Sequence, residues 1–190
     1  MSTADSKFIL RKAADQDIAQ LHELIACSVH GLMTEAYEEK QLGAALGVWL
    51  GVDSQLIVDG TYFVVETEER GQRALVGCGG WSKRKTPFGS DYRPDREDAL
   101  LDPGIDAAKV RAFFVHPDWA RRGIGTMILR ECEQAAREAG FSRCEMGATL
   151  SGVPFYRSHG YSGDERIELS LANGETLPIL KMTKSLTETV

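Results

Sequence analysis

The sequence lacks the features of secreted, membrane-spanning and nucleic-acid-binding proteins. No stretch approaches the roughly 18 consecutive apolar residues of a membrane-spanning helix, and the first residues, MSTADSKFIL, have neither half of a secretory signal. Basic residues are too few for a general nucleic-acid-binding face, because 22 Lys and Arg stand against 28 Asp and Glu and the net charge is -6. We therefore expect a cytoplasmic protein that binds neither a membrane nor a nucleic acid.

Cysteine is also sparse, and its 4 occurrences are far apart. They form no C-x-x-C pair, and no histidines stand beside them at the spacing of a metal site. The 4 histidines are scattered too, as surface or capping residues would be. We expect reduced, mostly buried thiols, no disulfide and no bound metal. The cysteines are Cys27, Cys78, Cys132 and Cys144.

The rest of the composition is that of a globular protein. With 190 residues, 43% hydrophobic and 26% charged, the chain is long enough to bury one core. No internal repeat or domain linker interrupts it. We expect a single domain that spans residues 1–190.

The N-terminal part predicts a strand, two helices and a hairpin. The alternating pattern at 7–13 indicates a short strand, and Asp15 is placed to cap the helix that follows. A second helix is expected from about 34 to 50, ended by Gly51. TYFVVET (61–67) and ALVGCGGWS (74–82) flank a polar turn and predict an antiparallel hairpin. The expected buried positions of the two helices are Ile18, Leu21, Ile25, Val29, Leu32, Tyr37, Leu42, Ala45, Leu46 and Trp49.

The C-terminal part predicts a strand-helix-strand unit followed by a short helix and a hairpin. A strand at 109–115 is stopped by Pro117, and a helix follows at 126–140 with Ile128, Cys132, Ala135 and Ala139 on one face. Further elements are strands at 142–150, 167–171 and 176–186 and a short helix at 152–161. The crossover within 109–149 must join parallel strands. The fold class is therefore α/β, with a mixed, mostly antiparallel sheet of about six to seven strands and flanking helices.

A long segment between these parts carries no regular pattern. Residues 82–108 contain three prolines, two glycines and many charges, and they exceed the roughly 12 to 15 residues usual for an unstructured connection. Such a segment is either a lid or binding loop or a disordered, solvated excursion.

The stretch DWARRGIGT, at the start of the helix near 126, indicates an anion-binding turn. Gly123 and Gly125 let the backbone bend sharply and approach a ligand, and the free amides of a helix N-terminus favour a phosphate. The alternative is an ordinary helix entry with two solvated arginines. The P-loop pattern is absent, and Ile128 stands where a dinucleotide fingerprint needs its third glycine.

Two motifs resemble those of the GNAT superfamily of N-acetyltransferases. VHPDWARRGIGT is similar to the family's [QR]-x-x-G-x-[GA] motif, which follows a strand and opens a long helix. TLSGVPFYRSHGY, about thirty residues later, is similar to N-x-x-A-x-x-F-Y-x-x-x-G-[FY]. The opening LRKAADQDIAQL also resembles the family's first strand and helix, so the resemblance covers nearly the whole chain.

The resemblance implies a GNAT-like sheet whose parallel crossover carries the site for acetyl-CoA, the co-substrate. The strand before the turn would lie along the pantetheine arm and place an amide near the thioester carbonyl. One of its two phenylalanines is expected to be core. Thr149 would hydrogen-bond the pantetheine arm. The strand residues are Phe113, Phe114 and Val115, and the pyrophosphate-binding residues are Arg121, Arg122, Gly123, Ile124, Gly125 and Thr126.

Tyr156 matches the family tyrosine that protonates the departing thiolate, a role open to a phenol because its ordinary pKa is near 10. The alternative is an aromatic packing residue.

The sequence departs from the family pattern at three places. Ala120 replaces the usual Gln or Arg, which removes one side-chain contact to the pyrophosphate. Thr149 and Gly152 replace the Asn and Ala of the second motif. Where some members carry a carboxylate base, the strand begins with Lys109, Val110 and Arg111, so no base transfers by position.

These observations predict an N-acetyltransferase that moves the acetyl group to a primary amine of a small molecule by direct attack in a ternary complex. Three alternatives stay open: acetylation of a protein N-terminus or lysine, transfer of a longer acyl group, and a non-catalytic acyl-CoA sensor. Whether the chain forms a homodimer is open as well. A cationic amine calls for acidic or aromatic neighbours. The candidates are Glu35, Tyr37, Glu38 and Glu39, with Asp91, Tyr92, Asp95 and Asp106 in the long loop.

Overall fold

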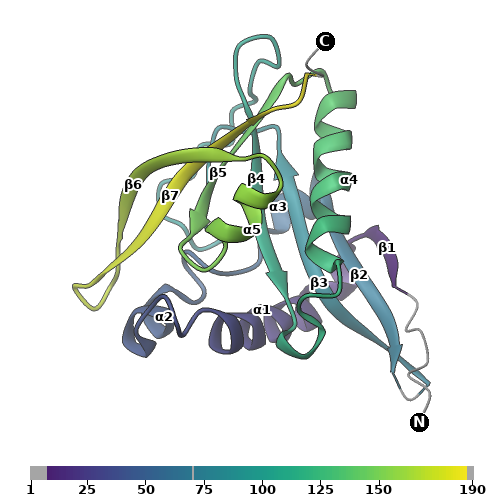
Figure 1. The fold of residues 1–190 in the computed structure, drawn as a ribbon, viewed down its shortest axis with the longest axis vertical. Helices are drawn as coiled ribbons and strands as arrows, with labels where there is room; N and C mark the ends of the chain where they lie inside the picture. Colours follow the sequence, from purple (N-terminus) through teal and green to yellow (C-terminus); the bar gives the residue numbers. More distant parts are fainter. Residues whose placement is uncertain (1–7, 70, 188–190) are drawn as a thin grey trace.

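The computed structural model describes residues 8–69 and 71–187 and is built on a seven-stranded sheet in the order β1-β2-β3-β4-β5-β7-β6 (Figure 1). The pair β4–β5 is parallel and the other neighbours are antiparallel. The predicted mixed, mostly antiparallel sheet is thus confirmed. The strands are β1 (Ile9–Lys12), β2 (Tyr62–Glu69), β3 (Gln72–Ser82), β4 (Ala108–Val115), β5 (Arg143–Thr149), β6 (Ser162–Ser170) and β7 (Thr176–Ser185).

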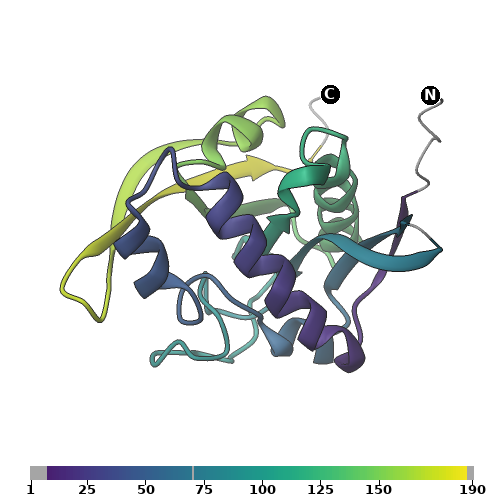
Figure 2. The same cartoon turned by 90° about the horizontal axis from the view of Figure 1, so that it is seen from below.

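Helices cover both faces of the sheet (Figure 2). The α1-side core lies under α1 (Ile18–Leu32), α2 (Glu39–Ala45) and α3 (Ser54–Val58), and the α4-side core lies under α4 (Ile124–Glu138) and α5 (Val153–Ser158). Side chains of a strand alternate between the two cores, because successive residues point to opposite faces. On β2, Tyr62 and Val64 enter the first core while Phe63 and Val65 enter the second. This double coverage explains why the hairpin strands are so apolar.

The regions on either side of α1 correct two predictions. The helix expected from about 34 to 50 is wrong in extent, because α2 ends at Ala45, and Gly47, which follows it closely, has a left-handed φ of 93°. Gly51 therefore ends no helix, and the short α3 was not predicted. Asp15 is not the cap of α1 but lies in a 3₁₀ turn, η1 (Asp15–Asp17). The carboxylate of Asp17 instead accepts the Ala14 amide at 2.8 Å.

The α4 helix buries a stripe that differs from the predicted one. Ile128 and Cys132 are buried as expected, but Leu129 and Ala136 complete the stripe, while Ala139 is exposed beyond the helix end. Three of the free cysteines are buried and Cys27 is exposed, which confirms mostly buried thiols. Among the described residues, no helix has the length and apolar character needed to cross a membrane.

Candidate active site

The glycine turn connects β4 to α4 through a 3₁₀ turn, η2 (Pro117–Trp119). Arg121 and Gly123 both have left-handed φ angles, of 65° and 84°, which bend the chain sharply into the helix. The first backbone hydrogen bond of α4 is donated by the Met127 amide to the Gly123 carbonyl at 2.9 Å. In the described chain, the amides of residues 124–126 therefore have no acceptor, and the helix dipole adds positive potential there.

Two arginines border this turn. Both Arg121 and Arg122 are exposed, and the Arg122 guanidinium lies 4.6 Å from the centre of the Trp119 ring. Neither forms an ion pair with any described residue. Their charges are thus available to an anion at the turn.

The two glycines of the turn have different surroundings. A Cβ on Gly123 would meet nothing within 4 Å, whereas a Cβ on Gly125 would lie 3.1 Å from the Phe155 ring of α5. The absence of a Cβ at Gly125 thus serves helix packing, whatever ligand its backbone amide meets. The small side chain of Gly125 lets α5 pack against the first turn of α4.

Thr126 is joined to α5 by His159, a residue that the sequence did not single out. Its Oγ1 lies 3.0 Å from His159 Nε2, and His159 Nδ1 lies 2.8 Å from the Phe155 carbonyl oxygen. Because a carbonyl can only accept, Nδ1 carries the proton in the neutral ring and Nε2 accepts from the Thr126 hydroxyl. The Thr126 amide, rather than its hydroxyl, remains for a ligand.

A gap opens between β4 and β5 beside this turn. The two strands pair at Ala108–Cys144 and Lys109–Glu145 and then diverge (Figure 1). Phe113 faces the α4 side, with its ring centre 6.2 Å from that of Tyr156, while Phe114 is buried in the α1-side core. One of the two phenylalanines is therefore core, as expected.

The next residue, Val115, is tied to the opposite side of the sheet. Its amide donates to Ser28 Oγ of α1 at 3.3 Å.

The β4 strand carries a bulge at the gap. Cys78 pairs with Phe114 and Gly80 pairs with Arg111, so one residue of β3 faces two residues of β4. At this bulge Ala112 has a left-handed φ of 53°. The bulge turns the peptide groups of β4 out of their ordinary ladder positions next to the gap.

Tyr156 lies on α5 at the same gap. Its side chain contacts Phe113, Phe155 and Tyr161, with ring centres 6.2, 5.1 and 5.8 Å away. Burial raises the pKa of the Tyr156 phenol well above its ordinary value, so the hydroxyl is protonated at neutral pH. No described residue accepts a hydrogen bond from this hydroxyl. Gly152 lies between Tyr156 and Thr149, since its Cβ position is 3.2 Å from both side chains.

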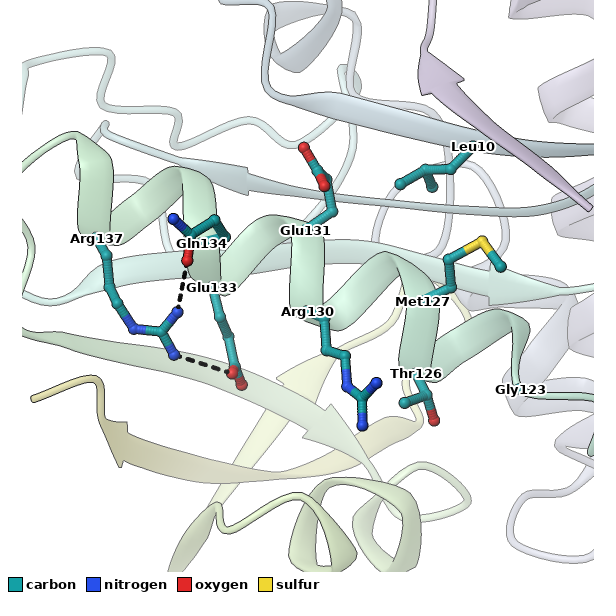
Figure 3. A pocket seen from close by; sticks show the side chains of 9 residues that line it. All are labelled: Leu10, Gly123, Thr126, Met127, Arg130, Glu131, Glu133, Gln134 and Arg137. Carbon is teal, nitrogen blue, oxygen red and sulfur yellow. Dashed lines mark hydrogen bonds and ion pairs between the residues drawn. The ribbon is translucent and has the colours of Figure 1, made fainter. Parts of the chain in front are cut away.

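A depression follows the outer face of α4 from Gly123 to Arg137 (Figure 3). Figure 3 shows Thr126 and Arg130 projecting to the same side of the helix, one turn apart. Arg130 is exposed and has no ion-pair partner in the described part of the chain, whereas Arg137 pairs with Glu133 at 3.8 Å. Arg130 was missed from the sequence, although its position four residues after Thr126 could have indicated it.

A second depression lies at the elbow between α1 and α2. Its lining includes His30 and the predicted candidates Glu35, Tyr37, Glu38 and Glu39. The Tyr37 hydroxyl accepts the Leu150 amide and donates to the Pro178 carbonyl, both at 2.7 Å. This side chain therefore fixes the elbow against the end of β5.

The long segment 83–107 is folded against the protein, which excludes the disordered alternative. Its backbone bonds Val48 and Val52 at 2.9 and 3.0 Å, and Phe88 lies 2.9 Å from the Cβ position of Gly147 on β5. Arg84 binds Asp59 through two hydrogen bonds of 2.7 Å. The segment thus covers part of the α1-side face of the sheet.

Two of the acidic candidates of this segment have hydrogen-bond partners within the protein, and one aromatic candidate is exposed. Asp91 accepts from the Ser54 amide and hydroxyl at 2.9 and 3.0 Å and so caps α3. Asp106 accepts the Asp102 amide at 2.8 Å, and Tyr92 is 70% exposed. Asp91 and Asp106 thus have structural partners of their own, and their role at an acceptor stays a prediction.

The first residues of β4 are engaged in ion pairs. Lys109 pairs with Glu145 across the parallel strands. The Arg111 guanidinium lies 2.7 Å from the buried carboxylate of Asp53, and burial lowers the pKa of Arg111 to about 10. Asp53 also binds Arg96 of the long segment at 3.0 Å. Neither β4 residue provides a base at the gap.

Comparison with known proteins identifies the fold and the family. One similar solved structure is a GCN5-related N-acetyltransferase from Rhodopseudomonas palustris, with 22% identity over 97% of this chain and 99% of that chain and a TM-score of 0.67. A second is the PaiA N-acetyltransferase from Thermoplasma acidophilum in complex with coenzyme A, with 14% identity over 94% of this chain and 99% of that chain and a TM-score of 0.61. A third is YncA from Salmonella typhimurium with its cofactor acetyl-CoA, with 18% identity over 97% of both chains and a TM-score of 0.58. No curated protein sequence matches the chain significantly. The family model of the acetyltransferase (GNAT) domain matches residues 58–162, which include the glycine turn, the gap and α5. Because this match covers more than half of the sequence, the chain belongs to the GNAT acetyltransferase family.

Proposed function

We propose that the protein transfers the acetyl group of acetyl-CoA to a primary amine of a small molecule by direct attack in a ternary complex. One observation carries the proposal: unbonded amides at the glycine turn, the gap beside β4 and the protonated phenol of Tyr156 lie around one short helix, α5. Acyl transfer from a phosphorylated thioester needs a phosphate-binding turn, room for the pantetheine arm and a proton donor for the leaving thiolate.

The proposed cofactor site uses the turn for the pyrophosphate. The amides of residues 124–126 bind phosphate oxygens, Gly123 keeps the approach open, and Arg121 and Arg122 supply charge. The pantetheine arm lies in the gap, along the backbone of 113–115 and next to Thr149. Phe114 contributes its backbone alone, because its side chain is in the α1-side core. Two of the similar structures contain coenzyme A or acetyl-CoA, which supports acetyl-CoA as the co-substrate.

The proposed reaction forms one bond, between the amine nitrogen and the acetyl carbon, and breaks one bond, between that carbon and sulfur. The amine nitrogen attacks the thioester carbon, and the oxygen that becomes negative accepts a hydrogen bond from the Phe113 amide. The carbon–sulfur bond then breaks, and the CoA thiolate takes the phenol proton of Tyr156. The amine nitrogen gives one proton to water before it attacks and a second after the bond to carbon has formed, because Lys109 and Arg111 are cations held in ion pairs and accept none. Water then returns a proton to Tyr156.

Two features favour a small cationic acceptor. The elbow between α1 and α2 carries the exposed carboxylates of Glu35, Glu38 and Glu39, which attract a cation before it loses its proton. The segment 83–107 covers β5 through Phe88 and narrows access from the α1 side. We infer that this segment is a wall of the acceptor site, which limits the entry of a folded protein.

The test combines ligand binding with product analysis. Coenzyme A should raise the thermal midpoint, because a ligand at one hundred times its dissociation constant stabilises the folded state by about 2.7 kcal/mol. Incubation with acetyl-CoA and a panel of polyamines, amino acids, aminoglycosides and peptides should release free CoA with at least one small amine. The mass of that amine should increase by one acetyl group.

Three results would contradict the proposal in different ways. Binding of CoA without CoA release by any acceptor would favour a sensor. Acetylation of peptides alone would favour a protein N-terminus or lysine as acceptor. Faster release from longer acyl-CoA substrates would show a different donor.

A further inference from the structure

Two side chains in the α1-side core contact the strained bulge of β4, and neither takes part in the proposed reaction steps. Ala112 adopts a left-handed φ of 53°, which is costly for a residue with a Cβ atom and needs compensation by its surroundings. Its carbonyl oxygen lies 3.3 Å from the Tyr62 hydroxyl and 3.8 Å from the Cys78 thiol. Both groups can donate a hydrogen bond to it.

Tyr62 reaches the bulge across a neighbouring strand. It belongs to β2 and is fully buried, and its ring passes beneath β3, where a Cβ on Gly80 would lie 2.9 Å from the ring. Its hydroxyl also lies 3.4 Å from Cys78 Sγ. Burial raises the pKa of the Cys78 thiol to about 12 and that of the Tyr62 phenol as well, so both keep their protons. The pair therefore contacts the carbonyl from the α1 side and from the β3 side of β4.

The geometry of one peptide group connects this contact to the gap. In a trans peptide the C=O of one residue and the N–H of the next point in opposite directions, and the described residues contain no cis bond. Because Tyr62 lies in the α1-side core, the Ala112 carbonyl points to the α1 face of the sheet and the Phe113 amide points to the α4 face. Tyr156 and α5 lie on that face, next to the place where β4 and β5 diverge.

We propose that Tyr62 and Cys78 are positioning residues for acetyl transfer: they hold the Ala112 carbonyl so that the Phe113 amide is aimed at the thioester oxygen. The inference rests on the proposed function, because an aimed amide matters only if a thioester carbonyl occupies the gap. Neither side chain touches the reacting atoms. They act through the Phe113 amide, which binds the oxyanion. Their loss should therefore lower kcat and leave the affinity for acetyl-CoA unchanged.

The test compares Tyr62→Phe with a matched control on the same strand. Thr67→Val also removes a buried β2 hydroxyl, one that has no hydrogen-bond partner in the described residues. Loss of a whole oxyanion donor costs about 10² to 10³-fold in kcat, and a misaimed donor should cost about 10-fold. We expect this loss in Tyr62→Phe, a larger loss in Tyr62→Phe combined with Cys78→Ala, and none in Thr67→Val. The dissociation constant for acetyl-CoA should stay within about twofold in each.

A second readout does not depend on activity. In the ligand-free protein, the carbonyl ¹³C resonance of Ala112 and the amide resonance of Phe113 should shift in Tyr62→Phe but not in Thr67→Val. Unchanged resonances would overturn the inference even if the wild type proved inactive. So would a kcat equal to that of the wild type, or a fall in kcat matched by equal losses of affinity and thermal midpoint. A wild type that never releases CoA would instead refute the proposed function.

Discussion

At the scale of single residues, Tyr156 offers the sharpest test of chemistry. Removing its hydroxyl in Tyr156→Phe should lower kcat by about 10²-fold, the usual contribution of a general acid, and leave acetyl-CoA affinity unchanged. Burial raises the pKa of this phenol, so it stays protonated across the accessible range and should add no alkaline limb to the kcat profile below pH 10. The measurement is single-turnover transfer to the best amine across that range.

A control separates this role from packing. Tyr161→Phe removes another buried hydroxyl, from a ring 5.8 Å away. Equal kcat values for Tyr156→Phe and the wild type, with chemistry rate-limiting, would leave Tyr156 as a packing residue.

Motifs predicted the residues of the site that are close in sequence, but not their partners. The glycine turn and Tyr156 could be located because each lies in a short pattern with fixed spacing. His159, Ser28 and Tyr62 could not be assigned, since their contacts with Thr126, Val115 and Ala112 span 33, 87 and 50 residues. Such contacts depend on how strands and helices pack, which no local pattern records.

At the scale of elements, the packing of α4 against α5 controls the site. Gly125→Val should push the Phe155 ring away, because the Cβ position is already 3.1 Å from that ring. Overpacking of this kind costs about 1 to 3 kcal/mol. We expect a lower thermal midpoint and a lower kcat, since Tyr156 follows Phe155 on α5. Calorimetry and transfer assays would measure both.

A second substitution tests the cause. Adding Phe155→Leu to Gly125→Val makes room for the new side chain and should restore much of the stability and CoA affinity. If CoA binding is lost without loss of stability, and Phe155→Leu does not restore it, the valine blocks the pyrophosphate directly and the packing explanation is wrong.

Helices and strands could be predicted where the apolar periodicity extends over many residues. The prediction failed where local backbone geometry sets the end of an element. The strands of the hairpin and the helix α4 follow apolar patterns that burial against a sheet requires. The end of α2 could not be seen, because its apolar spacing continues past Ala45 to Trp49 while the chain turns at Gly47. The folded conformation of residues 83–107 could not be predicted either, because it depends on ion pairs such as Arg96–Asp53, whose partners lie 43 residues apart in the sequence.

At the scale of the whole molecule, two ion-paired carboxylates predict how stability depends on pH. Asp17 binds Arg11 at 2.6 and 2.8 Å, and this guanidinium lowers the pKa of the carboxyl. Asp59 binds Arg84 of the long segment, which lowers the pKa of Asp59 in the same way. A carboxyl with a lowered folded-state pKa binds fewer protons when folded than when unfolded. Its stabilisation is complete above the unfolded pKa near 4 and is lost as the pH falls through the folded value.

The free energy of unfolding should therefore fall from pH 5 toward pH 2, and each ion pair should contribute to the slope. Asp17→Asn and Asp59→Asn should each cost about 1 to 3 kcal/mol at pH 7, the worth of charged hydrogen bonds, and each should flatten the slope. Asp164→Asn is the control, because that carboxylate is exposed and has no ion pair among the described residues. Urea titrations at several pH values measure these slopes. If Asp164→Asn flattens the slope as much as the other two, general charge repulsion, and not these ion pairs, governs the acid response.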